Sequence, residues 1–141
     1  MNSSTPILLA IAGIAACLLG AAHFFFPVLF DFEGAIPENG PPLKPFRLLF
    51  FSHNTARTDV LGIAWVMNHC VSYVLVTVGF FDIFSKYWIA QPYGKGIAVW
   101  IAVWWGLRGF SQFYLGRRRA DWIVFSACLF LGLLHFAILF V

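Results

Sequence analysis

Four long apolar runs constrain the fold of this chain more than any other feature of its sequence. They cover about residues 7–30, 60–81, 97–115 and 122–141. An α-helix needs about 20 residues, at a rise of 1.5 Å each, to cross the hydrocarbon core of a bilayer. Uninterrupted apolar runs favour helices over the alternating strands of a membrane barrel. We therefore expect an all-α fold, an integral membrane four-helix bundle with four transmembrane helices, forming a single transmembrane domain over residues 1–141.

The composition excludes several classes of function. Hydrophobic residues make up 61% of the chain and charged residues 11%, against roughly 45–50% and 25% in soluble domains. A small soluble domain needs a polar surface, and this chain has too few charges to form one. The composition argues against a soluble enzyme, a disordered regulator and a nucleic-acid-binding protein. The expected surroundings are the lipid bilayer, with no nucleic acid as a partner.

The basic residues separate the two sides of the predicted bundle. One side carries the loops 31–58 and 116–119, and the other carries both termini and the loop 85–96. The first side holds six basic residues and the second holds two: Lys44, Arg47, Arg57, Arg117, Arg118 and Arg119 against Lys86 and Lys95. By the positive-inside rule, the loops 31–58 and 116–119 are cytoplasmic and both termini are non-cytoplasmic.

Within the loop 31–58, the run 46–51 is apolar but too short to span a bilayer. We interpret this run as an interfacial segment or as an extension of the second transmembrane helix.

Five polar residues are predicted to meet in the core of the bundle. Helical periodicity places each of them on a face of small or polar residues, which is the face that packs against neighbouring helices. Their positions along the spans put them at about 3–8 Å from the bilayer midplane, all toward the cytoplasmic side. The predicted cluster consists of His23, Asn68, His69, Arg108 and Gln112. His135 lies on the other side of the midplane and is left out of it.

Arg108 is the most informative member of the cluster, because an arginine near the bilayer centre costs roughly 2.5–3.5 kcal/mol on insertion scales. Two interpretations are open. The side chain either extends toward the cytoplasmic face and pairs with Asp121, or it binds an anionic group such as a carboxylate, a phosphate or a haem propionate.

The two histidines also have more than one interpretation. Hydrogen bonds between helices are the simpler one. Alternatively, His23 and His69 are axial ligands of one haem, with Arg108 near its propionates, and the abundant aromatic side chains would also suit a quinone. No other metal site is expected, and a proton-relay role is disfavoured because no acidic residue lies in the middle of a span.

The segment His53-Asn54, followed by Asp59, lies at the start of the second apolar run. With the chain length, four spans and cytoplasmic loops, this segment resembles the membrane-associated eicosanoid and glutathione metabolism family, whose second helix starts with asparagine and acidic residues. The first span lacks an arginine at its cytoplasmic end, and no glutamate follows Asn54 three residues later. The resemblance is architectural and implies no catalytic residue in this chain.

The leading hypothesis is a non-catalytic accessory or assembly subunit of a larger membrane complex, associating with other membrane subunits or with itself. It follows from the lack of paired carboxylates, a nucleophile–base motif, metal-ligand spacing or a phosphate loop. One alternative is a protein that binds haem, quinone or lipid through the His/Arg cluster. A second is a membrane enzyme of glutathione-transferase-like architecture acting on a lipophilic substrate.

Overall fold

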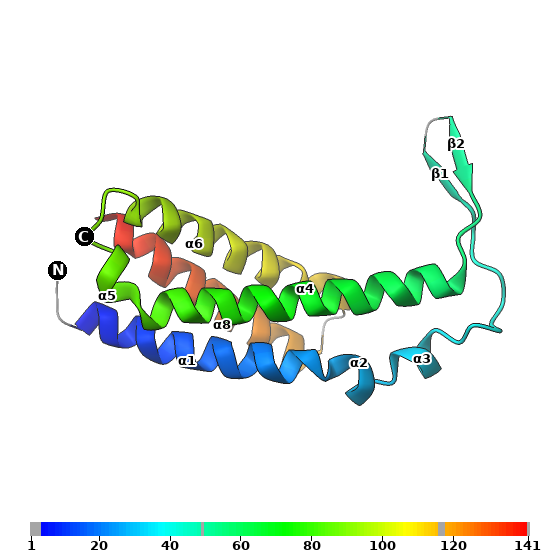
Figure 1. Cartoon of the computed structure of the whole chain (residues 1–141), viewed down its shortest axis with the longest axis horizontal. Coiled ribbons are helices and arrows are strands. Elements are labelled where there is room, and N and C mark those ends of the chain that lie inside the picture. The colour runs from blue at the N-terminus through cyan, green and yellow to red at the C-terminus, as the bar shows by residue number, and fades with distance from the viewer. Residues whose placement is uncertain (1–3, 49, 116–117, 141) are drawn as a thin grey trace. The chain divides into compact units, whose positions relative to one another are not determined.

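The protein is described by a computed structural model over residues 4–48, 50–115 and 118–140. Helices dominate it, as the apolar runs predict (Figure 1). Three stretches of helix are long and apolar enough to cross a membrane: Thr5–Phe24, Arg57–Ile83 and Arg119–Phe140. The apolar run at 97–115 forms a helix of 17 residues, Gly94–Phe110, followed by the short helix Gln112–Leu115.

The elements follow one another along the chain with short connections, except between α3 and α4. Their bounds are α1 (Ser4–Phe24), α2 (Phe26–Leu29), α3 (Phe32–Ala35), β1 (Phe46–Leu48), β2 (Phe51–His53), α4 (Arg57–Ile83), α5 (Ser85–Trp88), α6 (Gly94–Phe110), α7 (Gln112–Leu115), α8 (Arg119–Ala137) and the 3₁₀ helix η1 (Ile138–Phe140).

The contacts group into two compact units. Unit 1 comprises residues 1–14 and 80–141, and unit 2 comprises residues 15–79. The division falls inside α1 and inside α4, so each of these helices contributes to both units.

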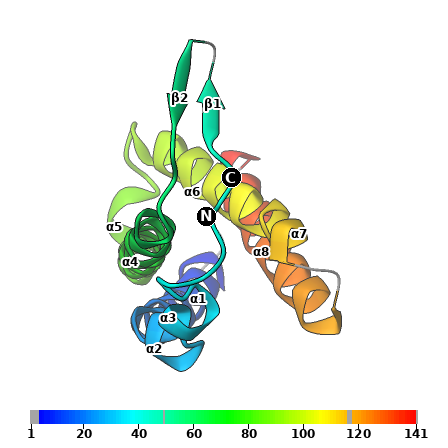
Figure 2. The same ribbon diagram turned by 90° about the vertical axis from the view of Figure 1, so that its right-hand side faces the viewer.

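Unit 1 is built around α6 and α8, which lie side by side in Figures 1 and 2. Two glycines allow the close approach. A Cβ on Gly109 would lie 3.2 Å from Cys128 Cβ, and a Cβ on Gly132 would lie 3.3 Å from the Ala102 carbonyl oxygen. Residue numbers rise along α6 as they fall along α8, so the two helices are antiparallel. Small residues at such contacts let helix backbones approach, which is how apolar helices gain packing energy in lipid.

Unit 2 pairs the second half of α1 with α4 in the same way. Cys17 Sγ donates to the Val76 carbonyl at 3.6 Å, and a Cβ on Gly20 would lie 2.9 Å from the Ser72 carbonyl oxygen. These contacts make α1 and α4 antiparallel within the unit. The close packing predicted for the small-residue face of the first span is confirmed at Gly20.

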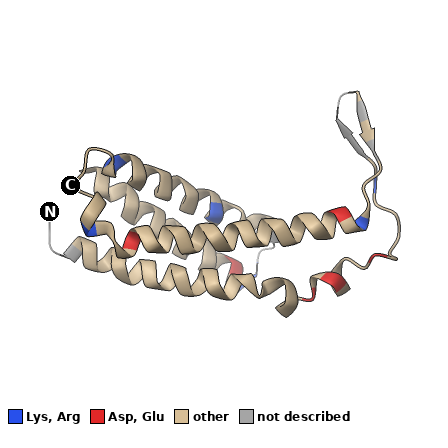
Figure 3. Cartoon of the chain, viewed as in Figure 1, with Lys and Arg blue, Asp and Glu red and all other residues tan. Residues whose placement is uncertain are grey.

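The segment between α2 and α4 is not helical through its length. Asp31 adopts a left-handed conformation with φ of 46°, and its carboxylate accepts from the Gly34 amide at 3.0 Å, which caps α3. Four of the six acidic residues fall between Asp31 and Asp59, and Figure 3 shows how few charged residues interrupt the long helices.

The run 46–51 corrects one expectation. It does not extend the second long helix, because residues 46–48 and 51–53 form an antiparallel hairpin with Phe46 opposite His53. The helix begins at Arg57, where the Asp59 carboxylate accepts from the Ala56 amide at 3.1 Å. This bond caps the start of the helix, and the aromatic residues in the preceding hairpin favour strands.

Candidate functional site

Asn68 and His23, two members of the predicted cluster, are joined in unit 2. Asn68 Nδ2 donates to the backbone carbonyl of His23 at 2.7 Å. In a continuous helix that carbonyl would accept from the amide of residue 27, but residue 27 is proline and has no N–H. α1 accordingly ends at Phe24. The Asn68 side chain therefore supplies the donor that Pro27 lacks, which matters most where water cannot do so.

The imidazoles of His69 and His23 each pack against aromatic rings of unit 2. The His69 ring centroid lies 5.3 Å from that of Phe24 and 5.6 Å from that of Trp65. The His23 ring centroid lies 4.2 Å from that of Phe26. Over the described residues, no group of three or more His, Cys, Asp and Glu side chains is placed to hold a metal ion. Haem ligation by the two histidines stays a prediction.

Arg108 and Gln112, the remaining members of the cluster, are joined in unit 1. The Arg108 guanidinium donates to Gln112 Oε1 and, at 3.3 Å, to Ser111 Oγ. The Ser111 hydroxyl in turn donates to the Arg108 carbonyl at 2.7 Å. Gln112 is buried and Arg108 half-buried. The three side chains thus span the junction between α6 and α7.

Asp121 does not pair with Arg108, which was one of the two interpretations of Arg108 from the sequence. Its carboxylate accepts from the Arg118 backbone amide at 2.9 Å and from Arg118 Nε at 3.2 Å. This pairing closes a capping box at the start of α8. In the described part of the chain, the ion-pair partner of Asp121 is therefore Arg118 and not Arg108. The capping box holds Arg118 and Asp121 within one turn of α8, whereas Arg108 is on another helix.

Of the predicted cluster, His23, Asn68 and His69 belong to unit 2 and Arg108 and Gln112 to unit 1, and a meeting of all five stays a prediction. Within each group, the hydrogen bonds run to the backbone or to a neutral side chain. Bonds of this kind hold helices together and satisfy freed backbone groups.

A site that the sequence interpretation missed lies in unit 1, where the last turn of α4 meets the last turn of α8. His135 Nε2 lies 2.7 Å from Asp82 Oδ1, and both side chains are fully buried. His135 Nδ1 lies 2.8 Å from the Leu131 carbonyl oxygen. A carbonyl oxygen only accepts, so Nδ1 carries a hydrogen. One further proton then lies between Nε2 and Oδ1, as imidazolium and carboxylate or as neutral imidazole and carboxylic acid.

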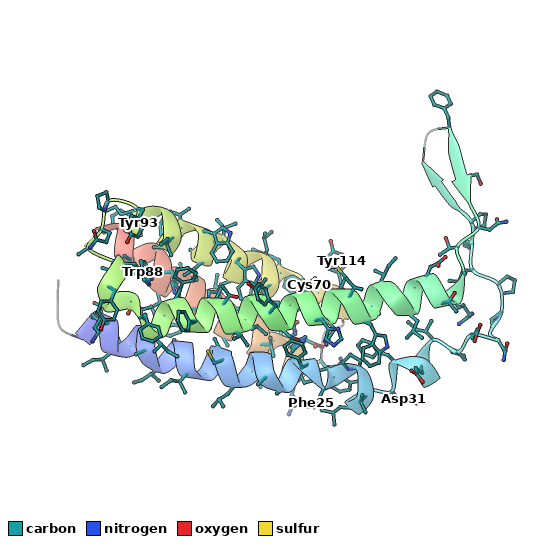
Figure 4. All side chains as sticks on the ribbon, viewed as in Figure 1. Phe25, Asp31, Cys70, Trp88, Tyr93 and Tyr114 are labelled. Carbon is teal, nitrogen blue, oxygen red and sulfur yellow. The ribbon has the colours of Figure 1, made fainter. Side chains whose placement is uncertain are left out.

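The end of α4 beside this pair is closed by Trp88 of α5. Its indole Nε1 donates to the Phe81 carbonyl at 2.7 Å, a carbonyl in the last turn of α4. Trp88 and Tyr93 are labelled in Figure 4 at this end of the unit. Lys95, in the first turn of α6, donates in the same way to the Leu139 carbonyl at 3.1 Å. A side-chain donor therefore satisfies one carbonyl at the end of α4 and one in η1, which follows α8.

One signal in the sequence points to the missed pair. Asp82 bounds the second apolar run and His135 lies near the end of the fourth, so both fall toward the side that carries the termini. An ionisable residue at matching depth on two apolar helices is a candidate pair. The predicted cluster around Arg108 lies in the opposite half of the bundle and therefore leaves this pair out.

Asn54, which the family resemblance singled out, lies in the segment before α4. It lines a cavity of about 510 Å³ with Glu38, Arg57 and neighbouring residues of unit 2. Arg57 Nε donates to the Pro41 carbonyl at 2.8 Å, which ties this segment to the start of α4. The side chain of His53 lies outside the described part of the structure.

Comparisons of the chain with protein-family models, with curated proteins and with solved structures gave no match.

Proposed function

We propose that the chain is an integral membrane protein with four transmembrane helices packed as a bundle. Three helices have the length and apolarity to cross a bilayer, and α6 with its 17 residues lies at the lower end of the spanning range. Both termini would be non-cytoplasmic, because the loops 31–58 and 116–119 carry most of the basic residues. A reporter enzyme that is active only outside the cytoplasm should be active when fused to the C-terminus and inactive when inserted after Asn39.

We propose further that the protein is a non-catalytic accessory or assembly subunit of a larger membrane complex. This proposal rests on one observation: the buried polar side chains form hydrogen bonds within the protein itself. Asn68 satisfies the carbonyl freed by Pro27, and Gln112 accepts from Arg108. These groups are engaged in holding their own helices, while many large apolar and aromatic side chains face outward and are available to lipid or to another subunit.

The accessory role predicts a stable assembly. The full chain, taken from its native membrane in a mild detergent, should migrate with a second polypeptide in fixed stoichiometry. Multi-angle light scattering gives the protein mass, to be compared with the 15.9 kDa of one chain. A chain expressed alone in a foreign host is the control, and it should lack the second polypeptide. Recovery of the monomer alone from the native membrane would contradict this role.

Arg108 supports a second candidate function, the binding of an anionic lipid or carboxylate ligand. Its hydrogen-bond partners in the described structure, Ser111 and Gln112, are both neutral. A guanidinium without a carboxylate partner retains donors for a phosphate or a carboxylate. Its half-buried position near the end of α6 lets the side chain extend toward the headgroups.

Substitution Arg108→Gln should lower the retention of phosphatidylglycerol by about tenfold, because a hydrogen bond to a charged group contributes roughly 1.5–3 kcal/mol. Native mass spectrometry of protein released from mixed phosphatidylglycerol and phosphatidylcholine vesicles counts the bound lipids. Lys86→Gln, which removes an exposed positive charge from α5, is the matched control and should retain the lipid. Equal retention by wild type and Arg108→Gln would rule out this second function.

A further inference from the structure

Two buried polar atoms beside the Asp82–His135 pair lack a hydrogen-bond partner among the described residues: Asp82 Oδ2 and Ser85 Oγ. Asp82 is fully buried and Ser85 is 1% exposed. The two residues are three apart and lie on either side of the break at Phe84, between α4 and α5. A buried carboxylate oxygen without a donor costs free energy, so each such atom requires an explanation.

The charge around this pair explains why a proton is held there. α4 and α8 both end in this region of unit 1, and the C-terminus of a helix carries partial negative charge that favours a cation. His135 supplies that cation when protonated, and Asp82 is its counter-ion. The other charged and titratable side chains of this end, Lys86, Tyr87, Tyr93 and Lys95, are exposed. Among the described side chains, the charge facing Asp82 from inside the unit is therefore that of His135.

We propose that Asp82, Ser85 and His135 form a hydrated proton-binding site, with one water molecule bound by Asp82 Oδ2 and Ser85 Oγ. The water would donate one hydrogen to the carboxylate and exchange a second hydrogen bond with the serine hydroxyl, which satisfies both open atoms. Buried water typically occupies sites of this kind. This inference does not depend on the accessory role proposed above.

The pair exchanges a proton with the bound water in one reversible transfer. The resting pair holds one proton between Nε2 and Oδ1. A hydronium at the water position transfers a proton to Asp82 Oδ2 and becomes water, which leaves a carboxylic acid beside an imidazolium with a net charge of +1. The reverse transfer returns the proton to the water. No other reactant is required.

The experiment uses the full chain in lipid nanodiscs, labelled with ¹⁵N-histidine and ¹³C-aspartate. The His135 resonance is the one of four histidine signals that shifts in Asp82→Asn. After transfer to D₂O, exchange of its Nε2 proton should be about tenfold slower in Ser85→Ala than in wild type. Ser126→Ala, on the exposed face of α8, should exchange as wild type does.

Equal exchange in wild type and Ser85→Ala would overturn the proposal, as would equal slowing in both serine variants.

A measurement on the wild type keeps the test independent of whether Ser85→Ala folds. Magnetisation should pass from water protons to the Asp82 carboxyl carbon, identified by its loss in Asp82→Asn. Lack of that transfer would show that no water is bound at Asp82 and that the Asp82–His135 pair is purely structural.

Discussion

Substitution His135→Leu should lower the free energy of unfolding by about 3–5 kcal/mol, because removal of one partner leaves the other buried and uncompensated. The Asp82–His135 contact of 2.7 Å joins two fully buried side chains from the ends of two helices. Asp82→Leu should cost a similar amount, since it removes the only acceptor placed at Nε2 in the described structure. Reversible unfolding in mixed micelles, followed by far-ultraviolet circular dichroism, measures both changes.

A double variant distinguishes a direct interaction between Asp82 and His135 from independent packing effects of the two side chains. Asp82→Leu with His135→Leu should lose less free energy than either single substitution, because it removes both buried polar groups together. Ser126→Ala, at an exposed site of α8, should change stability by no more than about 0.5 kcal/mol. Additive losses in the double variant would show that the two side chains do not interact.

Substitution Gly20→Ala should destabilise the protein by about 1–3 kcal/mol, the usual cost of overpacking. A Cβ at this position would lie 2.8 Å from Val76 Cγ2 and 2.9 Å from the Ser72 carbonyl oxygen. The backbone of α4 would have to move away from α1, because a carbonyl oxygen cannot rotate aside as a side chain can. The same unfolding assay measures the loss.

Gly62→Ala provides the matched control on α4. Nothing lies within 4 Å of a Cβ built at Gly62, so alanine should stabilise the helix by roughly 0.5–1 kcal/mol through its better helix propensity. The two glycine substitutions should therefore have opposite signs. A stabilising Gly20→Ala would contradict the close contact between α1 and α4.

The helices could be predicted from the sequence because hydropathy is a local property. The run 60–81 falls within α4, and the run 122–141 falls within α8–η1 as far as residue 140, where the description ends. The first apolar run extends to residue 30, whereas α1 ends at Phe24 and is followed by the short helix α2. The missing amide of Pro27 explains the early end, and it is visible in the sequence.

The candidate site was less predictable, because hydrogen bonds between helices depend on how each helix is rotated about its axis. Periodicity placed Asn68 and His23 on packing faces, and they do meet, but through a backbone carbonyl rather than through the imidazole. The partner of Asp121 was decided by local capping at Arg118. The pairing of Asp82 with His135 joins residues 53 positions apart and follows from tertiary packing alone.

The bond from Asn68 to the His23 carbonyl also bears on the biogenesis of the protein. When the ribosome releases the first span, the residue that will satisfy this carbonyl is still 45 positions away along the nascent chain. In the transmembrane arrangement that we propose, an oxygen near the end of α1 lacks its donor until that residue arrives, in a medium that offers none. The newly inserted first helix is therefore incomplete by itself, and maturation of its end should wait for synthesis of the second.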